Sequence, residues 1–289
     1  MELLFIVFAA GLRMSLPLVF ASLGGFMSER SGVINMALEC FLLVGAFTAA
    51  SVTSLSGNWL LGWSLAFALG TAAGLIYGLI VIKGRADQII IGTAMNLFAI
   101  GTIPFISKII FNSTGSTPSL PIELQTPSLP WILLVLVICL VTFLYRKTAF
   151  GLWLHSAGEN PEALVSAGVD VSKIRLISVS AGAGIAALGG ATLSMCLASN
   201  YSPQMSAGRG FIALAALIFG RWKPIPACLA CLFFGVIDGL QIQLQGISLG
   251  GVKIPVQFIQ IVPYAFTILA LAGFLGRAQA PKALGRAQL

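Results

Sequence analysis

Five polar side chains lie inside long apolar runs of this 289-residue chain and are its first candidates for chemistry: Asn35, Glu39, Asn96, Asp238 and Gln241. Polar and ionisable groups are costly inside a membrane, where they commonly line the pathway of a solute or an ion. Asp238 and Gln241 are three residues apart and therefore share one face of a helix. We predict that the five groups line a translocation path; the alternative is that they hold helices together through hydrogen bonds.

Motifs of catalysis and of metal binding are missing from the sequence. It has no phosphate-binding loop of the form G-x-x-x-x-G-K-[ST], no G-x-S-x-G and no H-E-x-x-H. His155 is the only histidine, which excludes histidine-based triads and multi-histidine metal sites, and we expect it in a loop. Cys228 and Cys231 form a C-x-x-C spacing, but no second cysteine pair completes a zinc site, so we interpret them as packing residues. We expect this chain to be no enzyme and to bind no cofactor or metal.

The composition of the chain, which is unusually apolar, indicates what kind of structure positions these groups. Hydrophobic residues make up 58% of the chain and charged residues only 9%, at a mean hydropathy of +0.99. A soluble domain has about 25% charged residues and could not hide so much apolar surface. The net charge of +7 would suggest a nucleic-acid partner in a soluble protein, but the basic residues cluster in short loops, so we set nucleic acid aside. The composition predicts an all-α polytopic membrane protein.

Apolar runs of about 20 residues, the length that crosses a bilayer, predict about nine spans. They are residues 3–24, 33–54, 60–82, 88–107, 130–146, 174–197, 209–221, 225–244 and 256–276, of which the seventh is short. The first run lacks a basic start and a small-residue cleavage site, so we expect a span and not a signal peptide.

The distribution of basic residues predicts the orientation of these spans. With the N-terminus outside and the C-terminus inside, twelve of the 16 basic residues fall in cytoplasmic segments, as the positive-inside rule requires. The external segments then hold only Lys108, Arg209 and Lys253. We predict a single transmembrane domain over 1–276, with a cytoplasmic loop over about 147–175, and a cytoplasmic basic tail over 277–289.

Two segments of similar pattern predict an internal repeat. RSGVINMAL begins at Arg30 and RGFIALAAL at Arg209, and each has an arginine, a nearby glycine and then an apolar helix. They open the second and seventh predicted spans, so the two copies would cross the membrane in opposite directions. Inverted repeats are common in transporters, with the pathway at the interface between the copies.

The stretch GENPEALVSAG, residues 158–168, is a polar segment between two apolar runs. Asn160 can cap a helix, Pro161 suits the first helical position, and Gly168 suits the helix end. These signals predict a helix of about seven residues, which is too short to be stable in water without a surface to pack on. That surface is this protein's own cytoplasmic face or a partner, and Leu164 and Val165 are the apolar side chains for the contact.

Three segments resemble the permease subunits of bacterial ATP-binding-cassette (ABC) importers in the branched-chain amino acid and simple sugar permease family. They are residues 29–50 (ERSGVINMALECFLLVGAFTAA), 158–175 (GENPEALVSAGVDVSKIR) and 207–245, which begins with AGRGFIALAALIFG. The third segment is most similar to the nucleoside-importer subgroup. One departure is Cys40, which stands where relatives usually have glycine after the glutamate.

The resemblance implies a division of labour among several subunits. A second permease chain, identical or paralogous, pairs with this one in the bacterial plasma membrane; separate cytoplasmic ATPases use the ATP, and an external lipoprotein delivers the substrate. The implied fold is that of type II permeases, like the vitamin B12 importer's. The GENP segment matches the family's coupling helix, which enters a groove of the ATPase, and the match covers Gly158, Glu159, Asn160, Pro161 and Gly168.

The resemblance also implies alternating access driven by ATP, with a nucleoside as the expected substrate. Simple sugars or branched-chain amino acids are alternatives within the same family. A different alternative is a stand-alone secondary transporter driven by an ion gradient, in which Glu39 and Asp238 would be proton or cation sites. A membrane scaffold that transports nothing is the remaining hypothesis.

Overall fold

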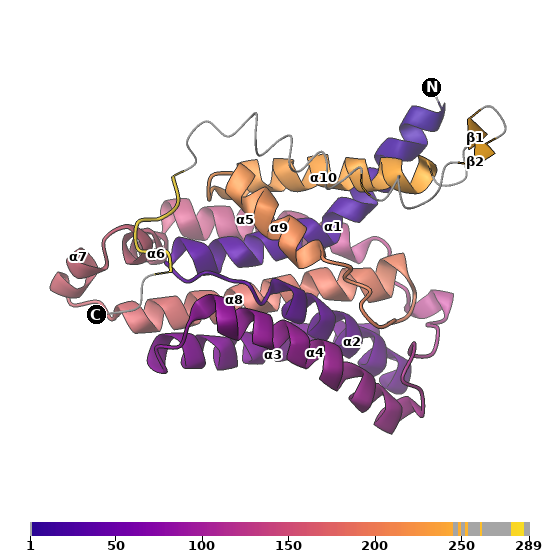
Figure 1. Cartoon of the computed structure of the whole chain (residues 1–289), viewed down its shortest axis with the longest axis horizontal. Coiled ribbons are helices and arrows are strands. Elements are labelled where there is room, and N and C mark those ends of the chain that lie inside the picture. The colour runs from indigo at the N-terminus through magenta and orange to yellow at the C-terminus, as the bar shows by residue number, and fades with distance from the viewer. Residues whose placement is uncertain (1, 245–247, 250–251, 254–260, 262–278, 286–289) are drawn as a thin grey trace.

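The computed structural model describes residues 2–244, 248–249, 252–253, 261 and 279–285. In these residues the chain forms a bundle of helices (Figure 1). The helices are α1 (Glu2–Arg30), α2 (Leu38–Ser56), α3 (Trp59–Gly78), α4 (Gln88–Phe111), α5 (Leu129–Lys147), α6 (Ala149–Glu159), α7 (Pro161–Ser166), α8 (Val171–Thr192), α9 (Arg209–Phe219) and α10 (Pro224–Leu244). The smaller elements are π-helical turns at Leu79–Lys83 and Leu193–Leu197, a 3-10 turn at Ile122–Leu124, and the antiparallel strands β1 (Ser248–Leu249) and β2 (Val252–Lys253).

Seven helices in the described part of the chain are long and apolar enough to cross a membrane, and α9 is a shorter apolar helix. They correspond to the first eight predicted spans, so the prediction of a helical, multi-pass membrane protein is confirmed. The ninth predicted span, 256–276, lies outside the described residues except for residue 261. The short seventh run forms α9, whose 11 residues reach about 16 Å, roughly half the thickness of the hydrocarbon core.

Helix α8 lies at the centre of the bundle and packs against α1, α2 and α3. Of its most apolar stretch 83% is buried, against 22% for α4 and for α5, which lie at the periphery. Small residues let the backbones of the central helices touch. A side-chain carbon at Gly182 would collide with the carbonyl oxygen of Gly24, and one at Gly190 would collide with that of Leu42. Close backbone contact of this kind is how membrane helices pack without a hydrophobic driving force between them.

The loops of the bundle gather at two opposite ends. At one end the backbone N–H of Ala283 donates to the carbonyl of Gly158 at 2.8 Å. At the other, the N–H of Thr117 donates to the carbonyl of Tyr201 at 3.0 Å, and that of Leu120 to Ser199 at 2.8 Å. This grouping agrees with the alternation of loops that the predicted spans require. Which end faces the cytoplasm stays a prediction from the charge distribution.

Candidate functional site

The carboxylate of Glu39 binds the beginning of α9. Its Oε1 accepts hydrogen bonds from the Ser206 hydroxyl at 2.6 Å and from the Gly208 N–H at 2.8 Å, and its Oε2 accepts from the Gly210 N–H at 2.8 Å. The first N–H groups of a helix carry partial positive charge and have no partner within the helix, so they suit a carboxylate. Gly210 allows the approach, because a side-chain carbon there would lie 2.5 Å from the backbone nitrogen of Glu39.

The chain between α1 and α2, residues 31–37, is not helical, and side chains satisfy its backbone. Ile34 N–H donates to Gln88 Oε1 at 2.7 Å, and the Ile34 carbonyl accepts from the hydroxyl of Tyr77. The Asn96 side chain donates to the Met36 carbonyl at 2.8 Å and accepts from Cys40 N–H at 2.9 Å. Irregular backbone inside a membrane bundle persists only with such partners.

The structure corrects the predicted start of the second span. This helix begins at Leu38, so Asn35 lies in the irregular segment and Glu39 lies in the first helical turn. Arg30 ends α1 and does not open the second span, whereas Arg209 does begin α9. The two similar segments therefore begin at unlike places, although Glu39 joins them directly; the inverted repeat itself stays a prediction.

The junction of α2 and α9 lies inside the bundle, away from its ends. Asn96 is eight residues into α4, which at 1.5 Å per residue is about 12 Å from the start of that helix. Because Asn96 binds Cys40 N–H, and Glu39 binds the start of α9, Arg209 lies at a similar depth. The charge pattern alone predicts Arg209 in an external segment. Its position next to an apolar run too short to cross a bilayer is the signal that indicates a helix starting within the membrane.

Three polar side chains on and near this junction differ from Glu39 in how their polar atoms are used. Neither side-chain atom of Asn35, which is fully buried, has a hydrogen-bond partner among the described residues. The same holds for Nε of Arg209, whose NH1 donates to the Met205 carbonyl at 3.1 Å. Asp238 of α10 is half-buried, and the charge of Arg209 acts on it.

The remaining two candidates of the predicted path lie on α10 and α4. Gln241 lies one turn beyond Asp238 along α10 and is also half-buried. Asn96 of α4, like Glu39, is engaged in hydrogen bonds within the chain. The structure therefore brings Glu39, Asn96 and Arg209 together at one depth, and it leaves unused polar atoms on Asn35 and Arg209.

The second candidate site is the short helix α7, at the end of the bundle where Ala283 binds Gly158. Its local signals act as expected: the Asn160 side chain accepts from Ala163 N–H at 3.3 Å, Pro161 takes the first position, and Gly168 adopts a left-handed φ of 78° just beyond the helix. The two apolar side chains of the helix face different ways. Leu164 is only 4% exposed, whereas Val165 is 63% exposed.

The burial of Leu164 decides what α7 packs on. Leu164 packs with the buried cluster of Ala157, Val171 and Ile174. It therefore holds α7 on this chain's own α6 and α8, and Val165 alone of the two apolar side chains is left on the outer surface.

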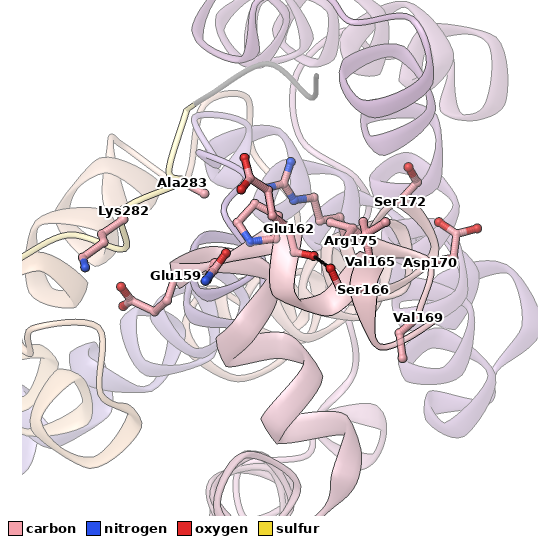
Figure 2. Close-up of a pocket in the computed structure, with 14 residues that line it drawn as sticks. Glu159, Glu162, Val165, Ser166, Val169, Asp170, Ser172, Arg175, Lys282 and Ala283 are labelled. Carbon is pink, nitrogen blue, oxygen red and sulfur yellow. Dashed lines mark hydrogen bonds between the residues drawn. The ribbon is translucent and has the colours of Figure 1, made fainter.

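A groove of about 1250 Å³ runs along α7 (Figure 2). Its wall combines α7 and the loop after it with Arg175 of α8 and, from the far end of the sequence, Lys282 and Ala283. Glu159, Glu162 and Asp170 add negative charge to this wall. The groove thus offers charges of both signs around the exposed Val165, which is a surface suited to a protein partner.

Arg30 ties the end of α1 to α5 and α6. It forms an ion pair with Glu159 at 3.2 Å, donates to the Tyr145 hydroxyl at 3.2 Å, and contacts Nδ1 of His155. His155 lies in α6, which corrects the prediction of a loop position. Burial and the positive charge of Arg30 lower the pKa of His155, which favours the neutral ring, whose Nδ1 can accept from Arg30.

Comparison with known proteins finds a matching family and several named relatives. The family model described as "Branched-chain amino acid transport system / permease component" matches residues 7–271. The chain is 36% identical to the guanosine ABC transporter permease protein NupQ of Bacillus subtilis, over 98% of this chain and 96% of the relative. It is 35% identical to the nucleoside ABC transporter permease protein NupC of Lactococcus lactis, over 97% and 95%. A provisionally named glucose ABC transporter permease, TsgC13 of Haloferax volcanii, is 30% identical over 92% of each chain. No solved structure gives a significant match.

Proposed function

The chain belongs to the family of branched-chain amino acid transport system permease components, and from that premise we propose that it is the membrane-spanning permease of an ABC importer for nucleosides. The substrate class is supported by one observation above all. The two relatives that match nearly the whole chain at 35–36% identity are named for nucleosides and for guanosine. The relative named for glucose is less similar, at 30%, and makes a simple sugar the second candidate.

The proposed importer has the subunits that the family resemblance implies. Two permease chains form the pathway, two cytoplasmic ATPases hydrolyse ATP, and an extracytoplasmic lipoprotein delivers the nucleoside. The proposed topology has the N-terminus outside and the C-terminus inside, in a type II fold with inverted repeats. In this arrangement α7 is the coupling helix, and Val165 is its exposed apolar contact with the ATPase.

The proposed pathway passes the junction of α2 and α9. A nucleoside presents ribose hydroxyls and base edges, which both donate and accept hydrogen bonds. The unused amide of Asn35, the unused Nε of Arg209 and the carboxylate of Asp238 offer complementary donors and acceptors at membrane depth. Helix termini and broken helices in the middle of the bilayer are a common site of substrate binding in transporters.

The test of this function is uptake by a host without nucleoside transport of its own, which expresses the permease with its ATPase and binding protein. We expect uptake of labelled guanosine that unlabelled nucleosides suppress and that ribose, glucose and leucine leave unchanged. We further expect it to disappear when the ATPase subunit cannot hydrolyse ATP and to persist when an ionophore collapses the ion gradients. If glucose and no nucleoside suppressed the uptake, the substrate would be a simple sugar. If the ionophore abolished the uptake and the loss of ATP hydrolysis did not, the secondary transporter would be favoured.

Asp238→Asn is expected to raise the KM of nucleoside uptake by about 10- to 100-fold, because hydrogen bonds to a charged group contribute about 1.5–3 kcal/mol. The amount of permease in the membrane should stay within about twofold, since the carboxylate forms no hydrogen bond with another described residue. Asp87→Asn is the matched control, because Asp87 caps α4 at the exposed surface and asparagine caps equally well. An unchanged KM with a loss of folded permease would assign Asp238 to holding helices together.

A further inference from the structure

The segment Pro281–Gly285, here called the C-terminal strap, is bonded to two distant parts of the chain. Ala283 N–H donates to the Gly158 carbonyl at 2.8 Å, and Gly285 N–H donates to the Gly32 carbonyl at 3.2 Å. Between them, Leu284 N–H donates to the Pro281 carbonyl and closes a turn. In Figure 1 the strap is the yellow trace beside α6. Ala283 is only 4% exposed, so the strap is packed into the protein and is more than a solvated tail.

The strap packs closely on both parts at a glycine. Gly158 precedes the cap of α7, and a side-chain carbon there would lie 3.3 Å from Cβ of Pro281. Gly285 adopts a left-handed φ of 75°, and a side-chain carbon there would lie 2.8 Å from Cδ1 of Ile34. Because close-packed groups transmit strain, these contacts offer a path from Gly158 to Ile34 through the strap.

A buried arginine near the start of α8 joins segment 31–37 to the end of α6. Arg175 of α8, which is 3% exposed, donates from Nε to the Ser31 carbonyl at 2.9 Å and from NH2 to the Ala157 carbonyl at 3.1 Å. A side-chain carbon at Gly32 would lie 2.9 Å from NH2 of Arg175 and 3.3 Å from the carbonyl oxygen of Ala283. Segment 31–32 and the end of α6 therefore meet at one guanidinium, and the strap packs beside Gly32 of the same segment.

We propose that the C-terminal strap is a positioning element that couples α7 to the pathway. It connects Gly158, two residues before the α7 cap, with segment 31–37, which contains Asn35 and leads into Glu39 at the α2–α9 junction. The inference rests on the proposed role of α7 as the coupling helix. It adds to that role a route by which movement at the ATPase reaches the buried end of α2, besides the covalent route through α6 and α8.

The test compares two shortened chains in the complete transporter, reconstituted in liposomes with its ATPase and binding protein. One chain ends at Ala280 and lacks the strap; the matched control ends at Gly285 and keeps it. Guanosine uptake and ATP hydrolysis are measured on the same samples and corrected for the amount of permease. We expect the chain ending at Ala280 to lose about tenfold or more of its uptake per ATP hydrolysed, within the range of coupling effects. The chain ending at Gly285 should match the wild type.

A point variant keeps the test decisive where the shortened chain fails to insert. Gly285→Val retains the strap but forces a side chain into the left-handed backbone against Ile34, and it should lower the same ratio. Gln279→Ala, which changes only an exposed side chain just before the strap and outside the groove, should leave the ratio at its wild-type value. The proposal would be overturned if uptake and hydrolysis fell in proportion, so that uptake per ATP hydrolysed stayed at the wild-type value in the chain ending at Ala280 and in Gly285→Val. Failure of the wild-type complex to take up any nucleoside would instead overturn the proposed function.

Discussion

Val165→Asp is expected to reduce strongly both nucleoside uptake and the stimulation of ATP hydrolysis by the loaded binding protein, while the permease still inserts into the membrane. Val165 is 63% exposed on the outer face of α7, so the substitution leaves the interior of this chain intact. At an interface with the ATPase, however, it buries an unpaired carboxylate, which costs several kcal/mol. We expect uptake to fall by about 30-fold or more, and the ATPase to separate more readily from the membrane complex.

Two variants of the same helix separate coupling from folding. Val165→Thr keeps the side-chain shape without a charge and should retain much of the uptake. Leu164→Asp changes a residue that is 4% exposed inside the contact of α7 with α6 and α8, so it should destabilise the loop itself and lower the yield of folded permease. Uptake is measured per folded permease, with ATPase retention followed by purification of the complex. Full uptake by Val165→Asp would exclude α7 as the coupling helix.

Local chemistry made α7 predictable from the sequence. Its cap, its first-position proline and the glycine after it act over a few residues, and the structure has them as expected. The first eight spans are equally local, because each is a run of apolar side chains. Which side of α7 faces the protein was not predictable in this way. Leu164 and Val165 are adjacent and both apolar, and only the position of α6 and α8 decides which of them is buried.

The contacts that define the buried junction were beyond prediction for the same physical reason. Glu39 and Ser206 are 167 positions apart, and nothing in either local sequence indicates that they form a hydrogen bond. The strap contact between Ala283 and Gly158 joins parts of the chain separated by most of the C-terminal half. Residue type indicated that Glu39 needed a partner at membrane depth. The partner is the beginning of α9. The depth of this junction depends on the packing of α2 against α4.

Glu39→Ala is expected to destabilise the fold more than any other single substitution at the α2–α9 junction. It removes the acceptor of three hydrogen bonds and leaves the buried Ser206 hydroxyl, the buried Gly210 N–H and the half-buried Gly208 N–H without this partner. Each buried unsatisfied group costs about 1–3 kcal/mol, so the total is about 3–5 kcal/mol or more. Since many folded proteins have only about 5–15 kcal/mol of stability, we expect little folded permease and almost no uptake. Thermal unfolding of the detergent-solubilised protein measures the change, with Glu123→Ala, in the loop between α4 and α5, as the control.

Glu39→Gln decides between the two roles that the sequence leaves open for this residue. Glutamine has the size of glutamate but only one acceptor oxygen, and its amide NH2 would face an N–H donor at the start of α9. If Glu39 chiefly holds α9 in place, the variant should unfold at a lower temperature, and its remaining folded fraction should take up nucleoside with a nearly unchanged KM. If the carboxylate instead binds substrate, KM should rise while the unfolding temperature stays close to wild type. We expect the first outcome, because both carboxylate oxygens are engaged with donors of α9 and the turn before it, whereas the side-chain atoms of Asn35 and Nε of Arg209 have no hydrogen-bond partner among the described residues.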